Sequence, residues 1–287
     1  MLERFRDRKQ LDSASVMPLK KADSFSARFQ MEFDFSNING LDWFNGNAAI
    51  SHWFDAYTLL VPENEAFYIR TLRHLVSSAS PDEKRLLRIF FGQEARHGEA
   101  HRLYAHKMNE MGLATAPFVE LANGIFYGAL EPIQPIGLRM ATVAAIEHVN
   151  ASMAHIVLSK DMFRNAHSDV RRLFYWHFAE EIEHKCVAHD FLVRDRPSYF
   201  LRALGGLIGF SAFFLASFTG MCFLLAQRKR LFTWKTLSEL KAFWIDEGVL
   251  KESVRHLASY FALNFDPRNL SDSALVDQVR GMLLEEC

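Results

Sequence analysis

The chain has 287 residues, 49% of them hydrophobic, and a formal net charge of -1. This length and composition are ample for one large core. The near-neutral charge, without a basic groove interleaved with aromatic residues, argues against general nucleic-acid binding.

The three cysteines, Cys186, Cys222 and Cys287, make neither a metal-ligand nor a redox spacing, and their odd number argues against a disulfide framework. They indicate a reducing compartment. Residues 1–10 contain no apolar run of the kind found in a cleavable signal. We therefore expect a cytoplasmic protein.

The sequence divides into four parts within a single domain. Residues 1–35 form a basic-leaning N-terminal arm, which fits a surface or partner segment. A helical bundle is expected over 36–198, an apolar helix or hairpin over 199–230, and amphipathic helices that pack on the bundle over 231–287. Few strands are expected, because strict period-two alternation is absent.

The first expected bundle helix carries one inward-facing glutamate, Glu65. Apolar residues recur on its stripe at helical spacing, namely Val61, Tyr68, Ile69, Leu72 and Val76. Glu63 falls instead on the side of Arg70. Glu65 is therefore the better ligand candidate.

The second expected helix begins after Ser80, where Pro81, Asp82 and Glu83 form a typical helix start, and Gly112 is a suitable stop. Its inward stripe contains a Glu-x-x-His pair and a further histidine, in the series Leu87, Phe90, Glu94, His97, His101, Tyr104 and Met108. Three prolines then cluster at Pro117, Pro132 and Pro135. This long connection is what a ferritin-like crossover requires.

The third and fourth expected helices repeat the pattern. Over about 136–161, Glu147 shares a stripe with Met140, Val143, Asn150, Ala151, Ala154 and Leu158. In the fourth helix, Glu181 and His184 form a second Glu-x-x-His pair, on one stripe with Leu173, His177, Ala188 and Phe191. The order Glu, Glu-x-x-His, Glu, Glu-x-x-His is the ligand set of a two-metal carboxylate site in a four-helix bundle.

Burying four carboxylates is costly unless they are paired or bind metal, and the same stripes carry no Lys or Arg. We therefore predict an all-α, ferritin-like bundle with two bound metal ions. The predicted ligands are Glu65, Glu94, His97, Glu147, His177, Glu181 and His184. Oxygen and nitrogen donors favour two irons, with manganese or an iron–manganese pair as the alternative and zinc less favoured. In the competing interpretation no metal is bound, and each buried glutamate and histidine is satisfied by its own hydrogen bonds.

Several further polar residues are candidates for catalytic or supporting roles. His177 either ligates a metal directly or bonds to a ligating glutamate. His101, one turn after His97, has three interpretations: substrate binding, proton relay or a hydrogen bond to a neighbouring helix. Tyr68 and Asn150 are expected to orient a carboxylate or a metal-bound oxygen, and Glu180 lies either on the polar face or next to a ligand that it supports. His148 and His155 face a helix interface.

The chain resembles the ferritin-like proteins described as predicted metal-dependent hydrolases, over roughly residues 40–265. The resemblance rests on Pro62 to Phe67, Gln93-Glu94-Ala95-Arg96-His97, Glu147-His148, His177 and Glu180-Glu181-Ile182-Glu183-His184-Lys185. Two departures are Asn64 in place of a glycine and Phe265-Asp266-Pro267 in place of a histidine before proline. In ligand pattern alone, the fourth helix is similar to that of di-iron arylamine N-oxygenases, which implies His177 as an additional ligand.

Residues 203–226 contain no charge and are bounded by Arg202 and by Arg228-Lys229-Arg230. The segment is long enough to span a bilayer. We expect membrane association at the inner face, as a span or a re-entrant hairpin, with a buried fifth helix or a homodimer interface as alternatives.

The leading functional hypothesis is dioxygen activation at two reduced irons, with oxidation of a hydrophobic, lipid-like or aromatic amine substrate and with an external electron donor. The alternative is a metal-dependent hydrolase in which two metals activate a water. A non-enzymatic metal-binding or storage protein ranks lowest.

Overall fold

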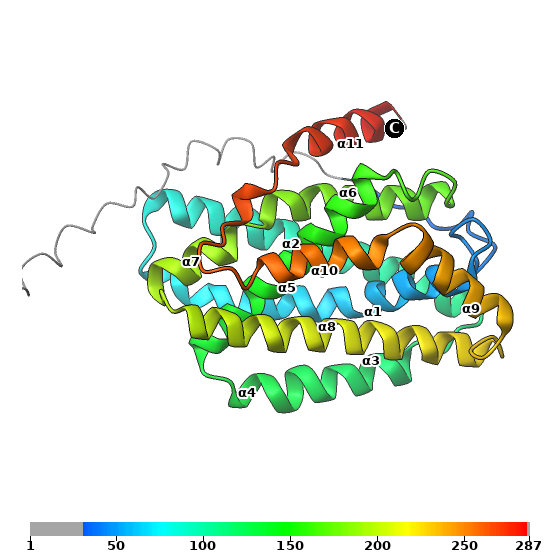
Figure 1. Ribbon diagram of the computed structural model, residues 1–287, viewed down its shortest axis with the longest axis horizontal. Coiled ribbons are helices and arrows are strands. Elements are labelled where there is room, and N and C mark those ends of the chain that lie inside the picture. Colours follow the sequence, from blue (N-terminus) through cyan, green and yellow to red (C-terminus); the bar gives the residue numbers. More distant parts are fainter. Residues whose placement is uncertain (1–30, 286–287) are drawn as a thin grey trace, which may run out of the picture.

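The structure is a computed structural model that describes residues 31–285. Within these residues the regular elements are helices and no strand is formed, as predicted. Figure 1 shows long helices that lie roughly along one axis, with shorter C-terminal helices across one side. The all-α fold is therefore confirmed.

Four long helices form the bundle: α1 (Ala48–Leu72), α2 (Pro81–Glu110), α5 (Ile136–Ser159) and α6 (Ser168–His184). Their contacts form a square, because α1 packs against α2 and α5, and α6 packs against the same two helices. Each of the four helices carries a predicted carboxylate ligand in a buried position. The predicted bundle, with its long crossover between the second and third helices, is confirmed.

Local signals fix the ends of α2. The Ser80 hydroxyl accepts a hydrogen bond from the Glu83 amide at 3.3 Å, and the Glu83 carboxylate accepts one from the Ser80 amide at 2.7 Å. This reciprocal pair is a capping box. Beyond the helix, Gly112 has a φ of 94°, a conformation that glycine adopts without strain. Both ends thus match the sequence prediction.

Helix α1 begins well before the predicted stripe and ends before its last residue, Val76. The helix begins at Ala48, capped by the Asn47 side chain, well before the expected stripe. Its first three turns are buried on all sides, so they show no apolar–polar periodicity from which a start could be predicted. At the other end, a 3-10 turn (Arg73–Ser77) removes Val76 from the helical stripe.

The crossover between α2 and α5 is itself helical. It consists of α3 (Ala116–Asn123), the π-helical segment η3 (Gly124–Leu130) and α4 (Glu131–Ile133), together called the crossover arm. An ion pair at 2.7 Å between Glu131 and Arg70 fastens the arm to α1. In Figure 1 the arm lies along one edge of the molecule, next to α8.

After α7 (Val187–Asp195), the uncharged segment forms one continuous helix, α8 (Tyr199–Gln227), which is the first of the two predicted forms, an apolar helix or a hairpin. The inner face of α8 packs on α1 and α5 as a fifth helix. By length and composition alone, α8 is the one helix among the described residues that could cross a membrane. Glycine permits the close packing of α8 on α5. At Gly205 a Cβ would lie only 2.5 Å from Ala141 of α5, so a larger residue would not fit there.

The C-terminal part is helical, as expected. It comprises α9 (Trp234–Lys241), the π-helical η4 (Ala242–Asp246), α10 (Val249–Ser259), the 3-10 turn η5 (Pro267–Asn269) and α11 (Ser273–Glu285). Of these, α10 packs on α5 and α11 packs mainly on α6.

Replacing Gly205 by alanine will destabilise the protein by about 1–3 kcal/mol, because the new methyl group meets the backbone of α5. Gly124→Ala is the matched control, since a Cβ there has no neighbour within 4 Å and alanine is the better helix former. Denaturant unfolding followed by circular dichroism measures both variants. Equal destabilisation would contradict the close packing of α8.

Candidate metal centre

Six of the seven predicted ligands come together inside the bundle. Their donor atoms form two groups, and within each group all donor atoms lie within 4.8 Å of one another. The first group is Glu65, His97, His177 and Glu181, and the second is Glu94, His97, Glu181 and His184. Because two residues belong to both groups, the donors form one continuous cluster.

Contacts within the cluster join helices that are far apart in the sequence. Glu65 Oε1 on α1 lies 3.4 Å from His97 Nδ1 on α2 and 3.4 Å from His177 Nε2 on α6. On the other side of the cluster, His184 Nδ1 lies 2.7 Å from Glu94 Oε1. Three of the four bundle helices therefore contribute donors that converge on one small volume.

Glu181 occupies the middle of the cluster. Its Oε1 lies 2.9 Å from His177 Nε2, 3.6 Å from His97 Nδ1 and 3.7 Å from His184 Nδ1. Glu181 is thus a carboxylate that belongs to both groups of close donors.

Many oxygen atoms of the cluster lack hydrogen bonds. Both carboxylate oxygens of Glu65 and of Glu147, and the Oε2 atoms of Glu94 and Glu181, are buried without a hydrogen-bond partner. Buried polar atoms in native proteins are nearly always satisfied. A divalent cation would satisfy these acidic oxygens and balance their charge, so the residues fit a metal site.

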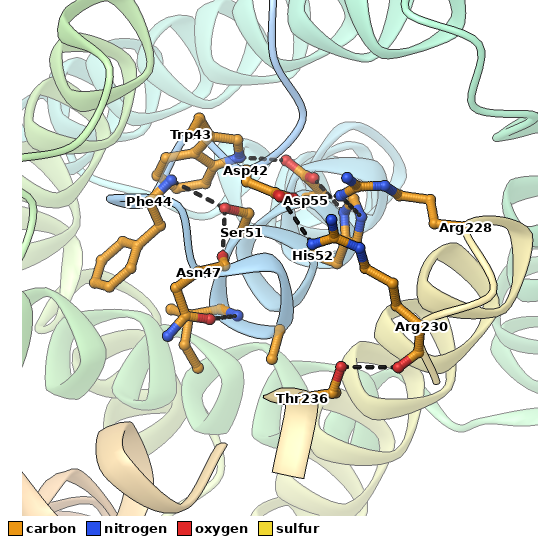
Figure 2. A network of polar contacts seen from close by, with 12 residues as sticks. Asp42, Trp43, Phe44, Asn47, Ser51, His52, Asp55, Arg228, Arg230 and Thr236 are labelled. Atoms are coloured by element: carbon orange, nitrogen blue, oxygen red, sulfur yellow. Dashed lines mark hydrogen bonds and ion pairs between the residues drawn. The ribbon is translucent and has the colours of Figure 1, made fainter. Parts of the chain in front are cut away.

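Asp55, on the same helix as Glu65, shows how this protein satisfies a buried carboxylate without metal. Its Oδ1 accepts hydrogen bonds from Trp43 Nε1 at 2.8 Å and from the Tyr104 hydroxyl at 2.9 Å. Its Oδ2 lies 2.8 Å from His52 Nδ1. Figure 2 shows Asp55 with Trp43 and His52, and the network continues from His52 to Arg228 near the surface. The contrast with the cluster carboxylates favours metal over the competing hydrogen-bond interpretation.

Glu147, the seventh predicted ligand, belongs to neither group of close donors. Its side chain on α5 is fully buried. Burial raises the pKa of its carboxyl well above the usual range, and the charges of Glu181 and Glu94 raise it further. Glu147 on the fourth bundle helix is therefore influenced by the charges of the cluster, although it is not among the close donors.

The acid–base properties of the cluster follow from burial. Burial raises the pKa of Glu94 to about 7, against the opposing influence of the neighbouring His184. It raises the pKa of Glu65 well above its usual range, with the other glutamates adding to the effect. Burial would also raise the pKa of Glu181, but the neighbouring His177 and His184 outweigh it and hold this pKa low. Bound cations would replace protons at the raised carboxyls.

The ring of His177 is held by residues on α1 and α2. His101 Nε2 lies 2.7 Å from His177 Nδ1, and His101 Nδ1 lies 3.1 Å from Thr58 Oγ1. The Tyr57 hydroxyl lies 3.4 Å from His177 Nε2. Because His101 engages Nδ1, the Nε2 atom of His177 is the one that faces the carboxylates. Of the three interpretations of His101, the geometry supports a hydrogen bond to neighbouring helices.

The other two cluster histidines are held in a matching way. His97 Nε2 lies 2.9 Å from Glu180 Oε2, and His184 Nε2 lies 3.2 Å from Gln93 Oε1. In both histidines the outer group engages Nε2, so Nδ1 is directed at the cluster. Such partners fix the tautomer and orientation of metal-binding histidines.

Gln93, Tyr57 and Thr58 were not among the predicted site residues. The sequence offered only their position as a signal, since Gln93 lies four residues before His97 and Tyr57 lies eight before Glu65, on the same helix faces. Neutral side chains at these places are indistinguishable from ordinary core residues in the sequence.

Tyr68 is buried beside the cluster, and its hydroxyl accepts a hydrogen bond from Asn64 Nδ2 at 2.8 Å. Asn64 Oδ1 in turn accepts one from the Tyr127 hydroxyl at 3.1 Å. These hydrogen bonds link α1, the helix that carries Glu65, to η3 of the crossover arm. Asn150 is buried on α5, with an Oδ1 that accepts no hydrogen bond.

Other polar residues lie away from the cluster. Glu63 pairs with Arg70 at 2.7 Å on the outer side of α1, as expected. His148 Nε2 bonds to the His256 carbonyl at 2.9 Å, and the rings of His155 and His256 lie 5.3 Å apart. Both histidines of α5 thus lie at the predicted helix interface, with α10.

A helical bundle with a buried carboxylate–histidine cluster defines a class of metal-binding bundle proteins. Within that class, the chain belongs to the family described as predicted metal-dependent hydrolase, whose model matches residues 27–271. This match confirms the resemblance seen in the sequence. No curated protein and no solved structure matches the chain.

Substitution tests the ligand assignment. Glu181→Ala and His97→Ala will lose bound metal while keeping their helix content, because each removes a donor shared by both groups. Glu63→Ala will retain metal, since Glu63 pairs with Arg70 outside the cluster. Elemental analysis after desalting measures metal content. Equal metal retention by the three variants would contradict the assignment.

The stability of the protein and its stabilisation by metal will both depend on pH through Glu94. The pKa of this carboxyl in the folded protein is about 7, above its usual value of 4.5. Its contribution to the stability of metal-free protein is present below that usual value and is lost as pH rises through the folded pKa. Metal requires the deprotonated carboxylates, so the increase in Tm on adding Fe(II) will be larger at about pH 8 than at about pH 5.5. Thermal melts under argon measure it. An increment independent of pH would contradict the account.

Proposed function

We propose that the protein is a di-iron enzyme that uses dioxygen to oxidise a hydrophobic substrate. The observation that carries the proposal is the acidic cluster inside an apolar bundle, with residues that are at most 2% exposed. Three glutamates and three histidines lie together as oxygen and nitrogen donors that suit iron, and Glu147 would add a fourth carboxylate. Manganese in one or both positions is the alternative.

Two iron ions held by these residues would supply the chemistry of dioxygen reduction, in which one oxygen atom enters a C–H or N–H bond and the other leaves as water. Two of the four electrons required come from the substrate bond and two from an external donor. The protein contributes ligands, orientation and a dry interior.

Aromatic rings separate the cluster from solvent. The Trp176 ring centre lies 4.7 Å from that of His97, the Phe90 ring 4.8 Å from His184, and the Tyr57 ring 5.8 Å from His177. Dioxygen is small and apolar, so it enters such an interior more readily than a polar ester or phosphate. Exclusion of water also protects reactive states from side reactions.

An apolar substrate is supported by the surroundings. The centre is enclosed by one continuous hydrophobic core. The polar groups that approach it from outside the ligand set are few: Tyr57, Tyr68, His101, Gln93 and Glu180. A lipid-like chain or an aromatic amine would replace water in this environment at little desolvation cost.

Hydrolysis is the second candidate, favoured by the description of the family. Two metals would lower the pKa of a bound water so that it attacks an ester, amide or phosphate. A glutamate of the cluster that is not engaged by metal would serve as the general base.

Anaerobic iron loading followed by exposure to oxygen distinguishes the two functions. We expect two irons per chain and a transient, oxygen-dependent optical absorption band. Glu63→Ala serves as the control that keeps the cluster intact. Two bound metals without any response to oxygen would contradict the oxygenase proposal and favour hydrolysis.

A further inference from the structure

The outer face of α8 is exposed and apolar along its length. Large side chains that are 46–65% exposed recur at helical spacing at Leu204, Leu207, Leu215 and Phe218. Phe200, at 83% exposed, extends this stripe at its N-terminal end. Since the opposite face packs on the bundle, α8 is half core and half surface.

The crossover arm has the same character. Leu121, Ile125, Leu130 and Ile133 are 40–75% exposed. Between Gly112 and Leu138 the sequence has two charged residues, Glu120 and Glu131, and Glu131 is buried in its ion pair with Arg70.

The arm and α8 lie side by side and run in opposite directions (Figure 1). Near one end, Gln227 exchanges hydrogen bonds of 2.8 and 3.2 Å with the backbone of Ala114. Near the other end, a Cβ on Gly137 would lie 3.5 Å from the Leu201 side chain. Together they form one surface, called the apolar face, that spans the length of α8, about 43 Å for 29 residues.

Basic residues stand at both ends of the apolar face, and aromatic residues accompany them at one end. Exposed Arg196 and Lys229 stand at opposite ends of α8, and exposed Phe232 and Trp234 follow Lys229. Arg228 and Arg230, also basic, are engaged by Asp42. By contrast, α2 exposes one large apolar side chain, Leu103, along 30 residues.

From this pattern we infer that the apolar face docks on a lipid bilayer with anionic headgroups, with α8 and the crossover arm lying in the plane of the interface. Leucine, isoleucine and phenylalanine on the face, with basic and aromatic residues at its ends, form the pattern of interfacial helices. A protein interface of this size normally mixes such residues with a polar rim and arginine. The helix lies on the membrane rather than across it, because its inner face is packed on the bundle.

Docking would also connect the membrane to the metal centre, a consequence that rests on the proposed function. Tyr127 in η3 of the arm reaches Tyr68 beside the cluster through Asn64. A π-helical segment is a frequent feature of functional sites. The arm thus stands between bilayer and cluster, and the substrate class is a lipid acyl chain or another bilayer-soluble molecule.

Co-sedimentation with vesicles tests the docking. The vesicles contain phosphatidylcholine with about one-third phosphatidylglycerol, a composition that supplies anionic headgroups. We expect the full chain to pellet with them and Leu215→Glu to lose about tenfold or more in partitioning. Leu284→Glu, on α11 at the opposite side of the molecule, is the matched control, because Leu215 and Leu284 are both 65% exposed.

Circular dichroism melts verify that both variants fold. We expect both to fold, because Leu215 and Leu284 are exposed. Wild-type protein that stays in the supernatant, or equal loss in both variants, would overturn the docking. Sedimentation velocity measures the oligomeric state. If the wild-type protein is a dimer that Leu215→Glu dissociates, and it does not bind vesicles, the apolar face is an interface with a second copy of the chain and the docking proposal is overturned. Pelleting needs no turnover, so failure of the oxygen chemistry would leave this result unaffected.

Discussion

The structure depends on keeping four carboxylates in an apolar interior. Glu65, Glu94, Glu147 and Glu181 lie one on each bundle helix, and each is at most 2% exposed. Such a cluster opposes folding unless protons or cations neutralise it. Bound metal would therefore contribute to the stability of the fold as well as to its chemistry, since these four helices hold glutamates at positions where leucine would pack better.

The rest of the molecule supports that centre. Each cluster histidine has one ring nitrogen engaged from outside, by His101, Gln93 or Glu180, so the other nitrogen is directed inward. The Asp55 network anchors the first turns of α1 with complete hydrogen bonding. Outside the bundle, α8 and the crossover arm cover the centre on one side and offer an apolar surface on the other.

Helical periodicity predicted the bundle and its acidic positions, because a glutamate on an apolar stripe is a conspicuous exception. It could not predict Tyr57 or Gln93, since neutral residues on the same stripes look like core. The early start of α1 was missed because those turns are buried on all sides. The role of α8 was ambiguous, because its sequence is apolar on every face and only packing shows which face meets the bundle.

The central claim is that the buried cluster binds a pair of metal ions. Iron K-edge X-ray absorption of the reconstituted full chain tests it most directly. The account predicts a first shell of oxygen and nitrogen donors and a second iron at roughly 3.5–4 Å, the spacing of two-metal sites. Iron without a metal neighbour, or with sulfur ligands, would contradict it.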